Sequence, residues 1–237
     1  MLSFDWNGKN SRDFGIWVLE PPDLSFAAER VNAQPIPGRA GELIFREGAD
    51  VYDSMTLSMK LWLPDGSAAA TVGDWLRGSG ELRVGNRPDG HYKARVSNQI
   101  DLKKVSRKGA DLNFTVNFRC DPFFYHDAPP DLVLTEAGNV ENPGNVAARP
   151  AISVKGTGGE VVLMVGEQIV TLNIPSAGAE CVIDSDMEEC YSVEGGAYVN
   201  RNGIMAGDFP RLLPGVNPVS WSGGVESVTI RPRWRSR

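Results

Sequence analysis

The sequence predicts a mainly β protein of two domains, an N-terminal α+β domain over residues 1–126 and a C-terminal β-sandwich over residues 127–237. Three observations lead to this prediction. Apolar and polar residues alternate over many segments, which is the period of a half-buried strand. One segment alone has helical spacing. The proline-containing stretch at 127–131 has the composition of a stiff linker.

The two halves also differ in charge. Residues 1–125 carry 16 Lys/Arg and 16 Asp/Glu, a net charge of 0, and residues 126–237 carry 8 and 14, a net charge of −6. This difference indicates two surfaces of different character. It also argues against general affinity for nucleic acid, which needs a basic face.

Two regions of the first half predict an antiparallel sheet. In residues 51–63, apolar side chains from Val51 to Leu63 alternate with polar ones, so this segment is expected to be a half-buried strand. Residues 100–105 and 112–118 flank a loop that contains Gly109, and they are expected to form a hairpin.

The single expected helix begins at Ser67, a suitable N-cap residue, and ends before Gly78, which stands where a C′ glycine belongs. Val72, Trp75 and Leu76 have i, i+3, i+4 spacing and form an apolar stripe. We expect this stripe to pack on the sheet.

Residues 29–44 contain Pro35, Pro37, Gly38 and Gly41 but few candidates for a core. A long connection without its own core is unusual in a compact domain unless it has a function or becomes ordered against a partner. We therefore expect this segment to contact another chain.

The second half has short β segments about every ten residues, separated by glycine-containing turn signals, which is the pattern of a β-sandwich. The expected turns include Gly166-Glu167, Gly195-Gly196, Asn202-Gly203 and Gly223-Gly224. The expected strands are residues 151–154, 161–165, 169–174, 180–183, 190–193, 197–199, 218–221 and 227–230. The glycine-rich run at 156–159 is not followed by the Lys-Ser/Thr pair of a phosphate loop, so we expect a hairpin turn there.

Residues suited to catalysis or to metal binding are few. No Gly-x-Ser-x-Gly elbow occurs, and His91 and His126 are isolated. Three unpaired cysteines, Cys120, Cys181 and Cys190, are expected to be buried, inert thiols. We therefore expect no enzyme activity, no cofactor and no metal. The N-terminal residues do not have the pattern of a signal peptide, so we expect assembly in a cytoplasm.

Two charged clusters allow more than one interpretation. The acidic group Asp184, Asp186, Glu188 and Glu189 could bind calcium, supply a carboxylate pair for glycoside hydrolysis, or form a solvated turn. At the C-terminus, arginines alternate with Pro232, Trp234 and Ser236; they are Arg231, Arg233, Arg235 and Arg237. A continued strand would place them on one face, either to bind an anionic partner or to protect an exposed sheet edge.

Several segments, taken in order, resemble the distal tail proteins (Dit) of siphophages. FDWNGKNS at 4–11 and DFGI at 13–16 are similar to the opening of that family, PGRAGEL at 37–43 to its "vpGrdG-x-L" segment, and FRCDPFFY at 118–125 to its "F-x-C-x-P-F-x-Y" segment. The similarity continues through residues 142–150, 183–185, 207–210 and 213–217, and so covers nearly the whole chain.

The resemblance implies a structural virion component at the tail tip, or baseplate. In the family, N-terminal domains form a hexameric ring and C-terminal galectin-like sandwiches surround it. The ring joins the tail tube to the tail-tip hub proteins, and DNA passes through its channel without specific binding. The family is not enzymatic and does not insert in membranes.

The resemblance and the residue patterns together give an expected ring or partner interface. Its members are Pro35, Pro37, Gly38, Arg39, Gly41, Lys103, Lys104, Arg107, Lys108, Arg231, Arg233 and Arg235. The lysine-rich part, residues 103–108, could equally be a solvated hairpin tip.

A carbohydrate-binding adhesion module is the alternative function, with Tyr191, Tyr198, Trp221 and Trp234 as candidates for sugar stacking. A glycan-degrading enzyme built on the acidic group is a third.

Overall fold

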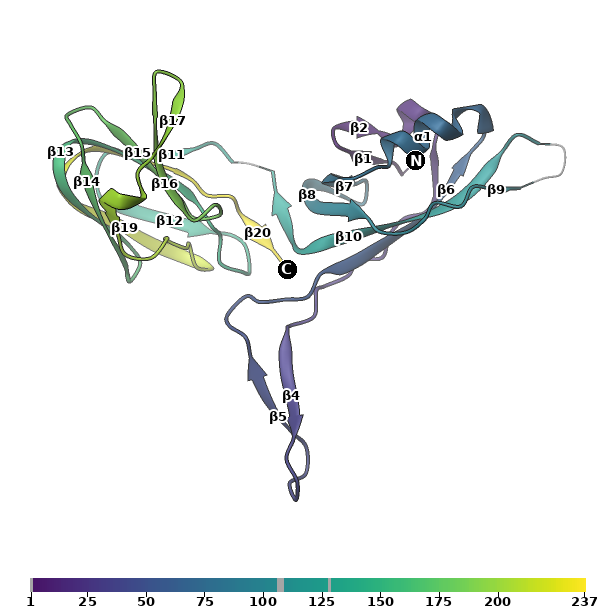
Figure 1. Cartoon of the computed structure of the whole chain (residues 1–237), viewed down its shortest axis with the longest axis horizontal. Coiled ribbons are helices and arrows are strands. Elements are labelled where there is room, and N and C mark those ends of the chain that lie inside the picture. Colours follow the sequence, from purple (N-terminus) through teal and green to yellow (C-terminus); the bar gives the residue numbers. More distant parts are fainter. Residues whose placement is uncertain (1, 106–108, 128) are drawn as a thin grey trace. The chain divides into compact units, whose positions relative to one another are not determined.

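The structure is a computed structural model that describes residues 2–105, 109–127 and 129–237. The chain folds into two compact units, one of residues 1–125 with Arg237 and one of residues 126–236 (Figure 1). In chain order the first unit contains β1 (Phe4–Trp6), β2 (Lys9–Asn10), the 3-10 helix η1 (Ser11–Phe14), β3 (Trp17–Glu20), β4 (Val31–Pro35), β5 (Glu42–Arg46), β6 (Met55–Leu63), η2 (Gly66–Ala68), α1 (Ala69–Trp75), β7 (Ser79–Val84), β8 (Arg87–Val96), β9 (Lys103–Lys104) and β10 (Leu112–His126).

An antiparallel sheet in the order β2-β1-β7-β8-β10-β6-β3 forms the body of the first unit. Its long central pair is β10 and β6, with Val116 opposite Met59 and Phe118 opposite Leu57. Directly opposite residues point to the same face, so the alternation along both strands builds one apolar face. That face is buried, as the sequence predicted, in a core with Phe4, Trp6, Ile16, Leu61, Leu63, Leu82, Tyr92, Phe114 and Phe124.

Helix α1 covers this apolar face (Figure 1). Val72 and Leu76 are buried, and the indole Nε1 of Trp75 donates a hydrogen bond to the carbonyl oxygen of Trp6 at 3.2 Å. The predicted apolar stripe is therefore confirmed. The predicted cap is wrong: the carboxylate of Asp65 accepts from the Ser67 amide at 2.9 Å and caps a 3-10 turn that precedes the helix.

The prediction of a hairpin between residues 100–105 and 112–118 is only partly correct. Strand β9 pairs with β10 over two residues, with Lys104 opposite Leu112 and Lys103 opposite Asn113. The main partners of β10 are β6 and β8 instead. Residues 97–102 do not pair as a strand because side chains of that segment hold it to β10, as described below.

The second unit contains β11 (Leu132–Leu134), β12 (Gly138–Asn142), β13 (Ala151–Val165), β14 (Gln168–Ile174), β15 (Glu180–Asp184), β16 (Glu189–Glu194), β17 (Ala197–Asn200), η3 (Asn202–Ile204), β18 (Met205–Ala206), β19 (Gly215–Arg231) and β20 (Arg235–Ser236). The early part of β13 pairs with β15 and its later part with β14. Strand β19 likewise pairs with β12 at its start and with β11 at its end. These two long strands therefore belong to both layers of a sandwich, whose core includes Ile152, Leu163, Leu172, Ile183 and Ile230.

All eight segments that the sequence predicted as strands lie within strands of this unit, but two predicted turns are wrong. Residues 156–159 and 223–224 do not end strands; they are bends within β13 and β19, where the pairing of these strands shifts register. Gly223 has φ +93°, and a Cβ there would lie 2.4 Å from the carbonyl oxygen of Glu160. Glycine permits both a turn and a bulge of this kind, so the composition alone did not distinguish them.

Candidate functional site

Strands β4 and β5 form a two-stranded sheet of their own, which extends away from the larger sheet of the first unit (Figure 1). We call residues 29–53 the arm. Its turn follows from the sequence: the Arg39 amide donates to the carbonyl oxygen of Ile36 at 3.1 Å, Pro37 lies at the second position, and Gly38 has φ +77°. Proline and then a left-handed glycine are what a type II turn requires. The segment that sequence analysis described as a connection is thus a paired hairpin.

The root of the arm is held by backbone and charged contacts. The Arg30 amide donates to the carbonyl oxygen of Val51 at 3.0 Å, and the Asp53 amide donates to that of Ala28 at 2.8 Å. Arg30 also forms an ion pair with Asp53 at 2.9 Å, and Arg46 forms one with Glu29 at 3.1 Å. Such contacts are worth little individually at an exposed site, but together they fix where the arm leaves the unit.

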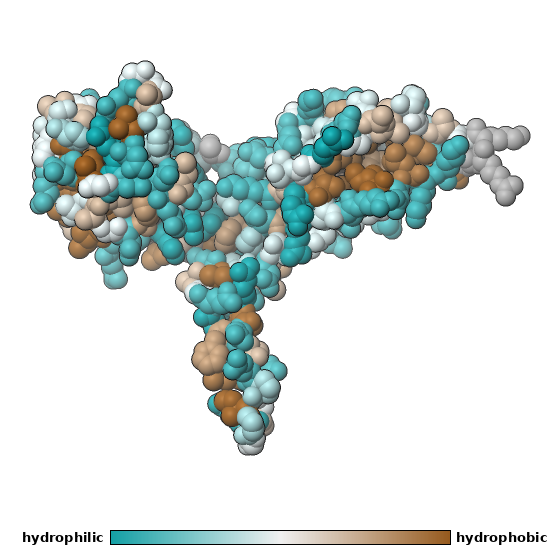
Figure 2. Space-filling model, viewed as in Figure 1, coloured by the Kyte–Doolittle hydropathy of each residue, from teal (hydrophilic) through white to brown (hydrophobic). Residues whose placement is uncertain are grey.

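Apolar side chains are exposed on both faces of the arm. Ala33 lies opposite Ile44 on one face, and Asn32 lies opposite Phe45 on the other. Ile44 is 60% exposed and Phe45 is 52% exposed. Figure 2 shows hydrophobic residues along this hairpin. Full burial of each such side chain is worth about 1.5–3 kcal/mol, and an isolated two-stranded ribbon is marginal in water, so the arm has the character of a segment covered by a partner.

A groove of about 390 Å³ lies elsewhere on the first unit, between the segment that follows β3 and the turn between β7 and β8. Leu24 and Phe26, 63% and 62% exposed, contribute apolar surface to it. It is lined by Pro22, Asp23, Leu24, Phe26, Leu57, Val84, Asn86, Arg87, Pro88, Asp89 and Tyr92. The amide nitrogen of Asn86 donates to the carbonyl oxygen of Pro22 at 3.2 Å and holds the two sides together.

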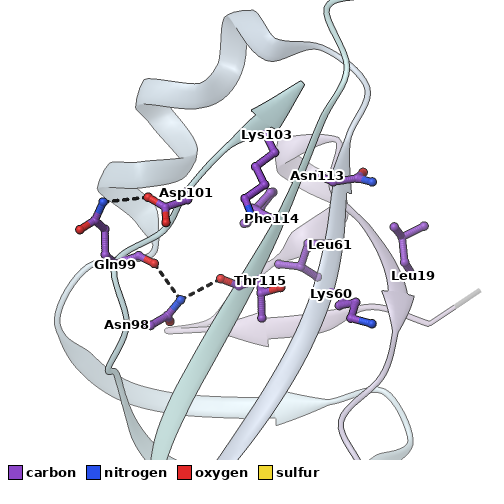
Figure 3. A pocket seen from close by; sticks show the side chains of 10 residues that line it. All are labelled: Leu19, Lys60, Leu61, Asn98, Gln99, Asp101, Lys103, Asn113, Phe114 and Thr115. Carbon is purple, nitrogen blue, oxygen red and sulfur yellow. Dashed lines mark hydrogen bonds between the residues drawn. The ribbon is translucent and has the colours of Figure 1, made fainter. Parts of the chain in front are cut away.

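Lys103, from the lysine-rich part of the predicted interface, lines a second pocket of the first unit, whose lining includes both Thr115 and the core residue Phe114 (Figure 3). Here Asn98 fixes the segment that follows β8: its amide nitrogen donates to the carbonyl oxygens of Gln99 and Thr115, both at 2.9 Å, and its oxygen accepts from the Asn117 amide at 2.7 Å. Lys103 and Lys104 are exposed, and Arg107 and Lys108 lie outside the described residues. Within the pocket, the Gln99 amide donates to Asp101 at 2.7 Å and the Lys60 ammonium pairs with Glu20, so several of its polar groups already have partners in the chain.

The C-terminal arginines do not form one face, so that part of the prediction is wrong. Strand β19 ends at Arg231, and Arg233 has a left-handed φ of +54°, which breaks the period of two. Each guanidinium has a partner in the second unit. Arg231 donates two hydrogen bonds to Asp131, of 3.1 and 3.0 Å. Arg233 donates two to Asp184, of 2.6 and 2.7 Å. Arg235 is buried and donates to the carbonyl oxygen of Ala147 at 2.7 Å.

Asp184 is the centre of the predicted acidic group and is 1% exposed. Its Oδ1 also accepts hydrogen bonds from the amides of Asp186 and Met187, both at 3.1 Å. Burial acts to raise its pKa, but the hydrogen bonds from Arg233 and from these amides outweigh burial, so the pKa of Asp184 lies below its ordinary value. The interpretation of a solvated turn is therefore wrong for Asp184, which is a structural carboxylate.

The other candidate chemical groups are separated. Within the described residues, no three His, Cys, Asp or Glu side chains come together in a way that could hold a metal ion. His91 lies 3.7 Å from Glu81 in the first unit, and His126 contacts Ser236 at 2.7 Å in the second. All three cysteines are buried and unpaired. Burial raises the pKa of Cys120 to about 12 and that of Cys190 to about 11, so these thiols are poor nucleophiles.

The four aromatic candidates for sugar stacking differ in how exposed their side chains are. Trp234 is buried and Trp221 packs partly against the sandwich core. Tyr191 and Tyr198 stack on each other, with ring centroids 4.5 Å apart, and Tyr198 is 50% exposed. The hydroxyl of Tyr198 donates to Glu189. Of the four, Tyr198 is the most exposed, Tyr191 and Trp221 are partly exposed, and Trp234 is buried.

Across the part of the chain that the structure describes, no helix is long and apolar enough to cross a membrane.

Comparisons with known proteins agree on the fold. No protein-family profile and no curated protein matches the sequence. Among solved structures, the chain is similar to the Dit protein of phage SPP1, a hub of the adsorption apparatus in phages that infect Gram-positive bacteria, with a TM-score of 0.76 and 15% identity over 98% of both chains. It is also similar to a chain of the phage P2 baseplate in its activated conformation, with a TM-score of 0.53 and 6% identity over 100% of this chain and 98% of that one.

The Dit fold is mainly β and has a galectin-like module. The fold class predicted from the sequence, an α+β unit followed by such a sandwich, is confirmed by this similarity. The chain has the fold of the Dit proteins of phage tail hubs and baseplates.

Proposed function

We propose that this chain is a distal tail protein, a structural and non-catalytic component of a siphophage tail tip. Copies assemble into a hexameric ring through the first unit, and the sandwiches surround the ring. The ring joins the tail tube to the tail-tip hub proteins, and DNA passes through its channel without specific binding. Assembly takes place in the cytoplasm of the host bacterium.

The observation that carries this proposal is the match to SPP1 Dit over 98% of both chains, at a TM-score of 0.76. Coverage of this extent includes both units, whereas a shared sandwich alone would cover only the second. The arm provides independent support, because its exposed apolar side chains suit contact with another chain. Interface residues proposed on this basis are Pro35, Pro37, Gly38, Arg39 and Gly41 of the arm, with Lys103 and Lys104 of β9.

Immunoelectron microscopy of particles of the encoding phage tests the location. Antibodies against the purified chain are expected to label the distal end of the tail, at the junction between tube and tip. Label along the whole tail would identify a tube protein instead, and the absence of the chain from purified particles would contradict a virion role. Particles of an unrelated siphophage serve as the control.

A carbohydrate-binding role is a second candidate, favoured by the exposed stack of Tyr191 and Tyr198 beside Glu189. Aromatic faces next to carboxylates can contact sugar rings. Cell-wall glycans of the host immobilised on a sensor surface test it: binding that is lost in Tyr198→Ala supports this role. No binding by the intact chain, or equal binding by the variant, contradicts it.

A further inference from the structure

The arm exposes an apolar tip on an extended hairpin, and the same unit contains a groove with exposed apolar walls. We propose that the arm tip of one copy docks in the groove lined by Pro22, Asp23, Leu24 and Phe26 of a second copy, with Arg39 facing Asp23. This inference rests on the proposed ring and names the contact that closes it.

The tip and the groove match in apolar character. The turn places Ile36 between Pro35 and Pro37, three consecutive residues with apolar side chains at the far end of the hairpin. On the groove side, Leu24 and Phe26 are among the most exposed apolar residues of the first unit, and the exposed Pro88 extends the same surface. Association would remove both surfaces from water at once.

The charges of the tip and of the groove are complementary. Arg39, at the tip, is exposed, and within the described part of the chain it has no ion-pair or side-chain hydrogen-bond partner. The same holds for Asp23 of the groove. The cation of the groove, Arg87, is already engaged: it donates to the hydroxyl of Tyr92 at 3.1 Å and lies 3.5 Å from the centroid of the Phe124 ring. The carboxylate of Asp23 therefore remains available to a guanidinium from outside.

The occupant is a second copy of this chain because the same unit carries both halves of the contact. The arm and the groove are different surfaces, so a contact between them is heterologous and can be repeated from copy to copy. A heterologous contact with a closing rotation produces a ring. The ion pairs at the root of the arm, Arg30 with Asp53 and Arg46 with Glu29, lie at the end of the hairpin opposite to the proposed contact.

A charge-reversal series in the full-length chain tests the pairing by sedimentation velocity. Arg39→Glu and Asp23→Arg are each expected to raise the apparent dissociation constant of self-association at least about tenfold, since each places like charges together. The double variant Arg39→Glu/Asp23→Arg is expected to recover association. The matched control is Arg211→Glu, a charge reversal at an exposed residue of the second unit, which should leave association unchanged.

Disulfide trapping provides a second measurement that does not depend on affinity. The variants Arg39→Cys and Asp23→Cys, purified separately and mixed under mild oxidation, are expected to give a crosslinked dimer that neither gives alone; the native cysteines are buried. An oligomer that forms without this crosslink, and that tolerates both charge reversals, would overturn the arm-and-groove contact and leave the proposed ring standing. A wild-type chain that stays monomeric at its highest soluble concentration would overturn both.

Discussion

The arm of the first unit and the C-terminal segment of the second both carry arginines that the sequence marks as partner-binding, yet the fold treats them differently. Arg233 has its carboxylate, Asp184, within the same unit, in a paired geometry of 2.6 and 2.7 Å. Arg39 stands at the tip of a hairpin with no partner among the described residues. A run of arginines therefore does not by itself indicate an interface; what matters is whether the fold already supplies the anion.

Charged side chains therefore have two different roles in the two units. In the second unit, the Arg233–Asp184 pair is part of the folded domain, because an unpaired buried carboxylate is costly. In the arm, by contrast, the charge of Arg39 and the apolar side chains of Ile44 and Phe45 are exposed, and we propose that they serve an assembly.

Removal of the arm is expected to have the largest effect. Replacement of residues 31–46 by a short Gly-Ser turn should abolish self-association completely, because the proposed contact between the arm and a second copy is lost. The cores of both units should remain intact, since no residue of β4 or β5 belongs to either core. Light scattering measures the association and near-ultraviolet circular dichroism measures the folding; an unchanged oligomer would show that the arm is not needed.

The variant Arg233→Ala is expected to lower the free energy of unfolding of the second unit by about 3 kcal/mol, because it leaves Asp184 buried without its counter-ion. Urea titration measures this loss. Self-association should not change, because the pair lies within one unit. A loss of association with normal stability would mean that Arg233 serves an interface after all.

Acid should weaken the second unit through the same carboxylate. The folded-state pKa of Asp184 is lowered, so its contribution to stability is fully present above its unfolded pKa of about 4 and is lost as the pH falls through the lower folded value. Thermal unfolding between about pH 5 and pH 2 should show this loss in the wild type. In Asp184→Asn the dependence should be shallower, and an equal slope in both proteins would contradict the assignment.

The smallest effect is expected for Arg231→Ala. Its ion pair with Asp131 also consists of two hydrogen bonds, but the Arg231 side chain is 60% exposed, and surface pairs are worth about 0–1 kcal/mol. Urea titration measures the free energy of unfolding of Arg231→Ala and of Arg233→Ala under the same conditions. Because Arg231 is the more exposed of the two arginines, the comparison isolates the effect of burial. A loss as large as that of Arg233→Ala would mean that geometry, and not burial, sets the value of these pairs.

Much of the fold could be predicted from the sequence because burial on one face of a strand leaves a period of two. The alternation from Leu57 to Leu63 and from Leu112 to Phe118 corresponds to the two central strands of the first sheet. The stripe of Val72, Trp75 and Leu76 likewise indicated the helix. The segments in the second half were correct for the same reason.

Other features leave no periodic signal. The arm has no buried face: Val31–Pro35 alternates in polarity, but Glu42–Arg46 does not, so the pattern did not identify two paired strands. The glycines at 156–159 and 223–224 allow a turn and a strand bend equally well. The partner of Arg233 lies 49 residues earlier in the chain, and the groove combines residues from three separate segments, so neither could be predicted before the fold was known.

The most direct test of the proposed assembly is the mass of the purified full-length chain, measured by light scattering behind a sizing column and followed by negative-stain electron microscopy. The proposed function predicts the mass of a hexamer and ring-shaped particles with an open centre. A monomer over the whole accessible concentration range, or an open chain of copies that does not close, would contradict it.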